Sequence, residues 1–507
     1  MQVISALNHL EAAHLIIGME TNLPYKPPRE NMSLLKDLVP DLHASKLESE
    51  TVPSLQNIIL VDNSSSVHPL TNLQATTNLT DILSPNSTSS VTPDSPLHRD
   101  DTINIQFTSG TTSSPKAACL THHSILNNGH SIGSRMLLTP DDIICCPPPL
   151  FHCFGSILGY MASATHGSCI LFPSEAFSPL AVLQSIQEER ATALYGVATM
   201  FIAELELLAD GIVDKTGFER LRTGIAAGSS VPSHLMEKLH NVLNLRGLTI
   251  CYGMTETSPV SCMTTPDDPL QKRVDSVGRL LPHVEAKVVD VHDNGKILPI
   301  GEKGELVVSG YNVMKGYWND QARTDEVRIV EPILEKGEKV GEKVWMYTGD
   351  EAEMDGDGYV KITGRIKDLI IRGGENIHPL EVENCLFRHT GVGEVSVVGL
   401  PDEKYGECVA AFIVVRHGVE AGPDDSGVSV KRDGSSHVQL RGVSEEEGPA
   451  TLTKESVRDW VRGELSGHLV PKHVFWVKEY PKTASGKIQK FKLRDMGIKL
   501  LEDAKAT

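Results

Sequence analysis

The sequence predicts an α/β protein with a large N-terminal domain, in which mixed or parallel sheets are layered with helices, and a small α+β C-terminal domain. Between residue 103 and about residue 300, short apolar runs alternate with helical patterns, which is typical of βαβ units around a parallel sheet. After residue 300, hairpin-like strands dominate. The 507 residues are also too many for one ordinary hydrophobic core.

The first hundred residues predict a helix, a strand and a long loop. Residues 1–20 are expected to form an amphipathic helix, with apolar positions Val3, Ile4, Leu7, Leu10 and Leu15. A strand is expected at residues 57–61. Residues 63–96 are rich in Ser, Thr, Asn and Pro and are expected to be a flexible loop.

The following elements are expected in this order. Strands are predicted at residues 103–107, 142–146, 167–172, 192–195, 304–309 and 358–363. Asp355–Gly358 predicts a hairpin turn rather than an EF-hand, because Tyr359 stands where a third oxygen ligand should be. Residues 417–450 are expected to be a charged surface insertion. The domains are predicted at residues 1–365 and 366–507.

Composition excludes several functional classes. A formal net charge of −19 argues against a nucleic-acid surface. Nine scattered cysteines without a C-x-x-C spacing favour reduced thiols over a disulfide framework or a zinc site. No apolar run reaches the length of a membrane span. The N-terminus lacks a secretory signal and the C-terminus is not a peroxisomal S-K-L address, so an intracellular, cytoplasmic protein is expected, with peroxisome and mitochondrion left open.

A small-residue loop follows the expected strand at residues 103–107. It reads Thr108-Ser-Gly-Thr-Thr-Ser-Ser-Pro-Lys116. Hydroxyl groups and inward-pointing backbone N–H groups can bind phosphate, Gly110 permits close approach, and Lys116 adds a positive charge. The loop is not a Walker A motif, which requires G-x-x-x-x-G-K-[ST]. A solvated loop is the alternative interpretation.

Four further motifs lie downstream in a fixed order. They are Tyr252-Gly-Met-Thr-Glu-Thr-Ser258, Tyr347-Thr-Gly-Asp350, the segment Gly364–Pro379 and Pro481-Lys-Thr-Ala-Ser-Gly-Lys487. With the Thr108 loop, these motifs resemble the AMP-forming adenylating superfamily of acyl-CoA synthetases, firefly luciferase and peptide-synthetase adenylation domains. The resemblance covers about residue 100 to the C-terminus, and residues 252–290 most resemble medium-chain acyl-CoA synthetases.

The resemblance implies a two-step ligase reaction. A carboxylic acid, expected to be a fatty acid, attacks the α-phosphate of ATP to give an acyl-adenylate and pyrophosphate, and the acyl group then passes to CoA. ATP, Mg²⁺ and CoA are the implied cofactor and co-substrates. The alternatives are loading of a separate acyl carrier protein in secondary-metabolite biosynthesis, an oxidative luciferase-like role, and a non-catalytic adenylate-fold protein.

By the same resemblance, individual residues receive roles in ATP binding. Lys487 is the expected catalytic lysine, Glu256 helps to hold Mg²⁺, and Thr255 contacts the α-phosphate. Asp350 accepts the ribose hydroxyls with support from Arg365. The β- and γ-phosphates are assigned to Thr108, Ser109, Gly110, Thr111, Thr112 and Lys116, and the adenine slot to Gly228, Ser229 and Tyr252.

The resemblance also implies a small domain that rotates between the two steps, with its hinge at Lys367 and a pantetheine tunnel at Gly373 and Gly374. Amino-acid-activating relatives carry an aspartate in the segment that matches residues 149–155, whereas this chain has His152 and no acid there. The expected pocket residues are His152, Phe151, Tyr195, Ala226 and Ala227. Two departures are a short segment before the Thr108 loop, expected to leave one sheet incomplete, and Ser113 in place of a glycine.

Overall fold

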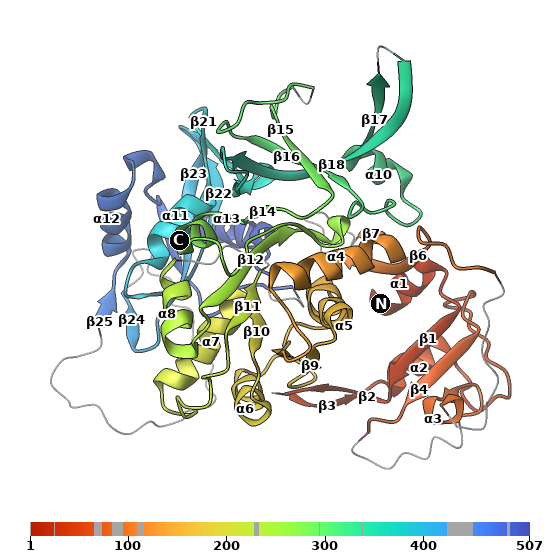
Figure 1. Ribbon diagram of the computed structural model, residues 1–507. Helices are drawn as coiled ribbons and strands as arrows, with labels where there is room; N and C mark the ends of the chain where they lie inside the picture. Colours follow the sequence, from red (N-terminus) through yellow and green to blue (C-terminus); the bar gives the residue numbers. More distant parts are fainter. Residues whose placement is uncertain are drawn as a thin grey trace.

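The computed structural model of the protein has a large N-terminal domain and a smaller C-terminal domain, both of mixed α/β structure, which confirms the predicted fold class (Figure 1). It describes residues 2–24, 26–64, 73–83, 95–108, 116–227, 233–293, 295–335, 338–422, 450–483 and 487–506. Within these ranges no helix is both long and apolar enough to cross a membrane.

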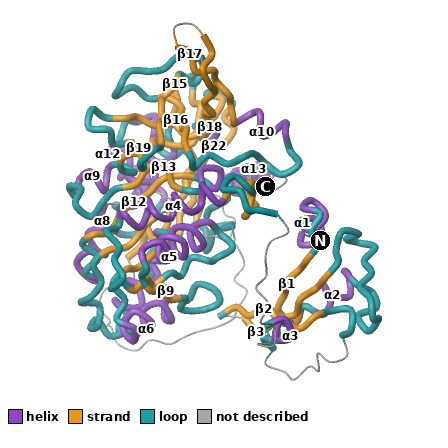
Figure 2. The backbone as a smooth tube through the Cα atoms, turned by 45° about the vertical axis from the view of Figure 1, so that its right-hand side comes forward, coloured by secondary structure: helices purple, strands orange, loops and turns teal. Residues whose placement is uncertain are grey.

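The N-terminal residues form a lobe at one side of the molecule in both views (Figure 2). Its parallel sheet has the order β1-β4-β5, and β2 and β3 form a hairpin. The elements are α1 (Gln2–Leu10), β1 (His14–Gly18), β2 (Glu20–Leu23), β3 (Lys26–Glu30), α2 (Met32–Leu38), β4 (Asn57–Val61), β5 (Thr77–Asn78) and α3 (Leu79–Ile82). The predicted strand at residues 57–61 is confirmed as β4.

Two predictions for this lobe are wrong in part. The predicted helix over residues 1–20 ends at Leu10, because Leu15 and Ile17 pair in a parallel ladder with Ile58 and Leu60 of β4. A strand forms here despite the helical spacing of the apolar residues, because β-branched residues pack well on a pleated surface. Part of the predicted loop at residues 63–96 is β5 and α3, and the remainder includes residues outside the described ranges.

The central sheet has seven strands in the order β14-β13-β12-β11-β10-β8-β9. Strands β8 to β12 are parallel, and β13 and β14 add antiparallel strands at one side. The strands are β8 (Ile143–Cys145), β9 (Cys169–Leu171), β10 (Ala193–Gly196), β11 (Thr223–Ala226), β12 (Gly247–Gly253), β13 (Val260–Met263) and β14 (Arg279–Leu280). The three βαβ strands predicted from the sequence are confirmed as β8, β9 and β10.

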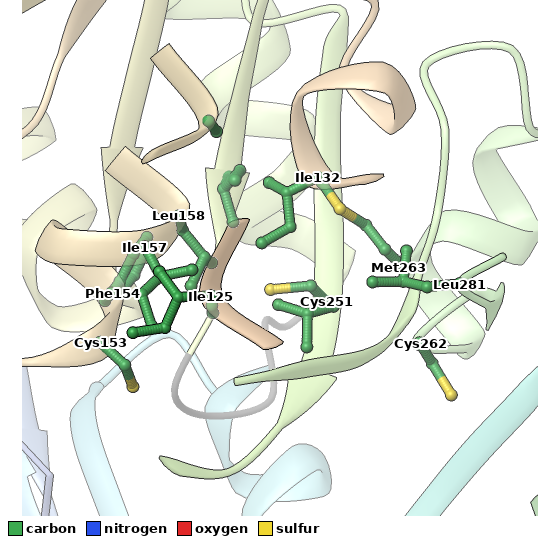
Figure 3. Packing of buried hydrophobic residues seen from close by; sticks show 14 of the residues in the cluster. Ile125, Ile132, Cys153, Phe154, Ile157, Leu158, Cys251, Cys262, Met263 and Leu281 are labelled. Atoms are coloured by element: carbon green, nitrogen blue, oxygen red, sulfur yellow. The ribbon is translucent and has the colours of Figure 1, made fainter. Parts of the chain in front are cut away.

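Helices cover both faces of this sheet, as a parallel sheet requires. Alternate strand residues enter different cores: Tyr195 and Ile225 pack with α4 and the π-helix, whereas Leu194 and Ala226 pack with α6, α7 and α8. Figure 3 shows the first core, with Ile125 and Ile132 of α4 close to Cys251 of β12. The helices are α4 (His122–Arg135), the π-helix Phe154–Met161, α5 (Ala162–His166), α6 (Pro179–Glu189), α7 (Ala198–Ala209), α8 (Ser233–Leu243) and α9 (Leu270–Asp275).

Two antiparallel units complete the large domain. The hairpin of β6 (Thr102–Thr108) and β7 (Lys116–Thr121) flanks the predicted phosphate loop. The other unit is a sheet of order β15-β16-β18-β17, with β19 also paired to β18. Its elements are β15 (Val284–Val289), β16 (Gly304–Gly310), α10 (Gln321–Val327), β17 (Arg328–Glu335), β18 (Glu338–Met354) and β19 (Val360–Arg365). The predicted turn at Asp355–Gly358 connects β18 to β19.

The small domain is an antiparallel sheet of order β21-β20-β23-β22, with β26 parallel to β23. One core lies under α11 and α12 and another under α13. The elements are β20 (Ile370–Arg372), β21 (Glu375–Ile377), α11 (Pro379–Phe387), β22 (Val392–Asp402), β23 (Gly406–Val415), β24 (Val419–Ala421), β25 (Ala450–Leu452), α12 (Lys454–Glu464), β26 (His473–Trp476) and α13 (Lys490–Ala506). The predicted domain boundary at residue 365 falls between β19 and β20 and stays a prediction. Residues 423–449 of the predicted insertion lie outside the described ranges.

Helix α7 carries a carboxyl group into the core beneath α6 and α8. Glu204 is fully buried, and neither of its carboxyl oxygens has a hydrogen-bond partner in the part of the chain that the structure describes. Burial without a compensating charge raises the pKa of Glu204 well above its usual value. This pKa shift lowers the free energy of unfolding in a pH-dependent way. The loss is absent below the pKa of about 4.3 in the unfolded chain, and it grows as the pH rises toward the higher pKa of the folded state.

Replacing Glu204 with leucine is therefore expected to stabilise the large domain. The gain should be about 1–3 kcal/mol near neutral pH, because an unpaired buried polar group is removed. Thermal unfolding at pH 5 and at pH 8 should show a larger gain at pH 8. Glu188→Leu, at an exposed position on α6, serves as the control. Equal gains at the two pH values, or a loss of stability, would contradict the assignment.

Candidate active site

Asp350 lies at the junction of the central sheet and the third sheet. Tyr252, near the end of β12, donates its hydroxyl to Asp350 Oδ2 at 2.6 Å. Arg365 lies opposite Asp350 in the antiparallel register of β18 and β19, with its Nε 3.3 Å from Asp350 Oδ1. Asp350 is only 6% exposed, so both carboxylate oxygens are fixed by neighbours rather than by bulk water. Burial and the Asp350 charge raise the pKa of Tyr252 well above its usual value.

A second acidic group follows directly after β12. Glu256 lies in the 3₁₀ turn Thr255–Thr257, is 6% exposed, and accepts a 2.8 Å hydrogen bond at Oε1 from the hydroxyl of Tyr317. The Lys116 ammonium lies 4.8 Å from the centroid of the Tyr317 ring, in cation–π geometry. Lys116 and Glu256, both predicted site residues, are thus joined through Tyr317. Sequence reasoning missed Tyr317, because the run Gly316-Tyr-Trp318 carries no chemical pattern that separates a site tyrosine from a core tyrosine.

Glycine at position 253 is required by the turn that carries Glu256. A Cβ at Gly253 would lie 1.7 Å from the carbonyl oxygen of Pro259, so any other residue would displace the backbone. The Thr255 hydroxyl lies 3.9 Å from the sulfur of Cys153, which brings this turn against the predicted acyl segment.

His152 lies two residues before the π-helix Phe154–Met161, in the predicted acyl region. Its Nδ1 accepts a 3.1 Å hydrogen bond from the backbone N–H of Phe154, an arrangement that requires a lone pair on Nδ1 and places the proton of the neutral ring on Nε2. Burial lowers the pKa of His152, and the nearby Lys487 charge lowers it further. π-Helical turns of this kind occur frequently at functional sites.

The remaining predicted pocket residues do not form one wall. Phe151 is 69% exposed, whereas Tyr195 and Ala226 are inaccessible to solvent. Tyr195 and Ala227 pack in the core under α4, and Ala226 packs in the core on the opposite face of the sheet. The Tyr195 hydroxyl is directed to the sulfur of Met136 at 2.9 Å.

Lys487 reaches this site from the small domain. It lies between β26 and α13, where its backbone N–H donates to Thr483 Oγ1 at 3.1 Å and its carbonyl accepts from Thr483 N at 2.8 Å. Lys487 is exposed as a whole residue, but protein atoms crowd its ammonium, and this desolvation, with the Arg365 charge second, lowers the pKa of Lys487 to about 8. The charges of Asp350, Asp368 and Glu256 act in the opposite direction.

Other predicted residues lie at the edges of this site or outside the described ranges. Thr108 ends β6 directly opposite Lys116. Lys367 lies in the 3₁₀ turn Ile366–Asp368 between the domains, and Gly373 and Gly374 form the turn of the β20–β21 hairpin, with φ of +62° and +89°. The predictions that fall outside the described residues are Ser109, Gly110, Thr111, Thr112, Gly228 and Ser229.

Two family models match the chain. The model described as AMP-binding enzyme matches residues 2–318, and the model described as AMP-binding enzyme C-terminal domain matches residues 381–487. The matched ranges contain Tyr252, Glu256 and Lys487.

Curated relatives and solved structures agree with these models. The chain is 44% identical to the acyl-CoA ligase sidI of Aspergillus fumigatus over 412 residues, which are 80% of this chain and 63% of the relative. It therefore spans less than two thirds of the length of that relative. It is 36% identical to the medium-chain acyl-CoA ligase ACSF2, mitochondrial, of Mus musculus over 474 residues, which are 91% of this chain and 68% of the relative. ATP-bound MatB from Rhodopseudomonas palustris superimposes with a TM-score of 0.66 at 27% identity, covering 87% of this chain and 79% of MatB.

The lowered pKa of Lys487 predicts an unusual reactivity. Only the neutral amine is acetylated, so acetylation of Lys487 by limiting acetic anhydride, quantified by mass spectrometry, should reach half its maximum near pH 8. Arg365→Gln removes a repelling charge and should move this midpoint to higher pH. A midpoint near the ordinary lysine value of about 10.4 in the unaltered protein would contradict the electrostatics of the cleft.

Proposed function

The chain belongs to the AMP-binding enzyme family, and we propose that it activates a carboxylic acid with ATP to form an acyl-adenylate and transfers the acyl group to CoA. One observation carries this proposal: a lysine of the small domain lies among the charged groups Asp350, Arg365 and Glu256 of the large domain. Adenylation brings a carboxylate against the α-phosphate, so a catalyst must supply positive charge at that point and hold both reactants in line.

The proposed ribose site is the Asp350 carboxylate. A carboxylate accepts hydrogen bonds from both hydroxyls of a ribose, and Asp350 is held for this role by Tyr252 and Arg365. The Tyr252 ring, fixed by that hydrogen bond at the end of β12, is proposed to bound the adenine. Gly228 and Ser229 are also proposed to line the adenine slot.

The proposed phosphate site lies between Lys116, Glu256 and Lys487. Glu256 fits a magnesium ion, because it is a nearly buried carboxylate whose Oε2 has no hydrogen bond within the described part of the chain. Bound Mg²⁺ would neutralise part of the triphosphate charge. The Lys116 ammonium is proposed to hold the β- and γ-phosphates, together with Thr108 and the following loop. Thr255 and the Lys487 ammonium are proposed to contact the α-phosphate, where phosphate charge favours the protonated form of Lys487.

His152 supports an uncharged acyl group. Its neutral ring can donate from Nε2 to a carboxylate or carbonyl oxygen, and the segment Pro149–Gly155 contains no acid to pair with a substrate ammonium. We therefore propose a fatty acid over an amino acid. Phe151, with most of its ring exposed, is the proposed wall residue that a substrate can reach without a core rearrangement.

The CoA nucleotide is proposed to bind beside the Gly373-Gly374 turn. The Arg372 guanidinium and the Lys404 ammonium lie 4.6 and 4.9 Å from the ring centroid of Tyr405, which is 39% exposed. Neither cation is paired with a carboxylate among the described residues. Arg372 also donates a 3.2 Å hydrogen bond to the carbonyl of His468. Two cations at an exposed aromatic ring suit a phosphorylated nucleoside, and a Cβ at Gly374 would meet no atom within 4 Å, which leaves room for a thiol arm.

The compartment and acceptor belong to the same proposal. A cytoplasmic location is proposed, although the name of the mouse relative includes the word mitochondrial. A separate acyl carrier protein is the alternative acceptor.

The activity is tested by pyrophosphate release. The protein is incubated with ATP, Mg²⁺ and carboxylic acids of two to eighteen carbons, including aryl acids, beside Lys487→Ala. One class of acid should stimulate release, and the variant should lose about 10²–10³-fold in rate because a charge at the transition state is removed. A folded protein that releases no pyrophosphate with any acid would contradict the proposal.

The CoA site is tested with shortened acceptors. Arg372→Ala and Lys404→Ala should each raise the KM for CoA by about tenfold, as expected for the loss of one charged contact with phosphate, and should leave the KM for pantetheine unchanged. Lys499→Ala, an exposed lysine of α13, is the control. Equal effects on both acceptors would contradict this placement, and a preference for a carrier protein over CoA would favour the alternative acceptor.

A further inference from the structure

A contact between an imidazole and a carboxyl group crosses the connection between the two domains. His378 Nε2 lies 3.3 Å from Glu351 Oε2, and the two side chains are only 16% and 10% exposed. Glu351 belongs to β18 of the large domain, whereas His378 is the N-cap residue of α11 in the small domain. The Thr363 hydroxyl is also hydrogen-bonded to the Glu351 carboxylate. Groups from β18, β19 and α11 therefore meet at one largely buried point.

The imidazole ring of His378 packs against the backbone of β19 at Gly364. Gly364 pairs with Glu351 in the register of β18 and β19, and a Cβ on Gly364 would lie 3.5 Å from His378 Nδ1. Nδ1 is buried and has no hydrogen-bond partner among the described residues, and Glu351 is the carboxyl group that contacts this ring there. Separating the two side chains would leave these largely buried polar groups without each other as partners, which is costly.

The pair lies one register position from the proposed ribose site. Glu351 follows Asp350 on β18, and Gly364 precedes Arg365 on β19. In the same orientation of the small domain, the charges of Asp350 and Arg365 act on Lys487. The orientation that joins Glu351 to His378 is therefore the orientation that places Lys487 at the site.

We propose that the Glu351–His378 contact positions Lys487 for adenylation by holding the small domain against β18 and β19. Both residues are positioning residues, because they act through Lys487. The short 3₁₀ turn Ile366–Asp368 joins the two domains, so rotation about Lys367 separates the pair. The kinetic part of this inference rests on the proposed function, whereas the orientation part does not.

The orientation is tested without reference to activity. Spin labels are attached to cysteines introduced at Glu237 on α8 and Arg462 on α12, after Cys169, the exposed cysteine of the described residues, is replaced by serine. The spin-labelled protein that retains Glu351 should give one narrow distribution of distances between the two labels, and Glu351→Gln should broaden it. The matched control is Glu383→Gln, whose pair with Lys490 at 2.8 Å has side chains 12% and 27% exposed and lies within the small domain. A distribution that Glu351→Gln leaves as narrow as the control would overturn the proposal.

The kinetic role is tested by measuring the half-reactions separately. Glu351→Gln should slow pyrophosphate release in the absence of CoA, with hydroxylamine as the trap, by about tenfold, because a contact between two largely buried polar groups is weakened. The KM for ATP and the rate of thioester formation from a supplied acyl-adenylate should stay within about twofold, since neither needs Lys487 in its adenylation position. His378→Arg retains an N–H donor that can reach the Glu351 carboxylate and should preserve most of the adenylation rate.

These measurements test the positioning role and the proposed function separately. Equal slowing of both half-reactions, or equal slowing by Glu351→Gln and Glu383→Gln, would overturn the positioning role. The combination of Glu351→Gln with His378→Gln should be no slower than either single variant if the two residues act as a unit. Absence of pyrophosphate release in the unaltered protein would instead refute the proposed function, and the distance measurement would still decide whether the pair sets the orientation.

Discussion

The Asp350 carboxylate connects the three parts of the chain that form the site. It accepts a hydrogen bond from Tyr252 of the central sheet, pairs with Arg365 across β18 and β19, and acts electrostatically on Lys487 of the small domain. A buried carboxylate is costly unless its oxygens are paired, and Tyr252 and Arg365 offset that cost for Asp350. The large domain holds this carboxylate on β18, beside the end of β12.

The same arrangement accounts for the unusual lysine. An ammonium crowded by protein loses solvation, and Arg365 repels it, while Asp350, Asp368 and Glu256 attract it. The balance lowers the pKa of Lys487 to about 8 and leaves an amine that bound phosphate would protonate. A charge that is costly without substrate and stabilised by substrate is suited to a site that works only when ATP is present. The Glu351–His378 pair adds a contact that is specific to this orientation of the domains.

The parallel sheet and most strand positions could be predicted from the sequence, because a buried strand such as residues 142–146 needs a continuous apolar run whatever its partners are. The strand at residues 14–18 could not be predicted from the sequence. Leu15 fits a helix equally well, and the strand is favoured only when Ile58 of β4 lies beside it. The grouping of Asp350, Glu256 and Lys487 was expected from the order of the motifs. Tyr317 and the Glu351–His378 pair were not foreseen, because each depends on contacts between residues separated by 27 or more positions in the chain. For Ala226 the motif position suggested a pocket wall. Side chains alternate between the two faces of a strand, and Ala226 faces the core formed with α6, α7 and α8.

We infer that the small domain brings Lys487 to the phosphates of ATP at a site built around Asp350. A crystal structure with Mg²⁺ and α,β-methylene ATP, which resists adenylation, would show this arrangement. We expect Asp350 to accept both ribose hydroxyls and the Lys487 ammonium to contact an α-phosphoryl oxygen, with the Glu351–His378 contact formed. A nucleotide bound away from Asp350, or bound there while Lys487 lies at the surface, would contradict it.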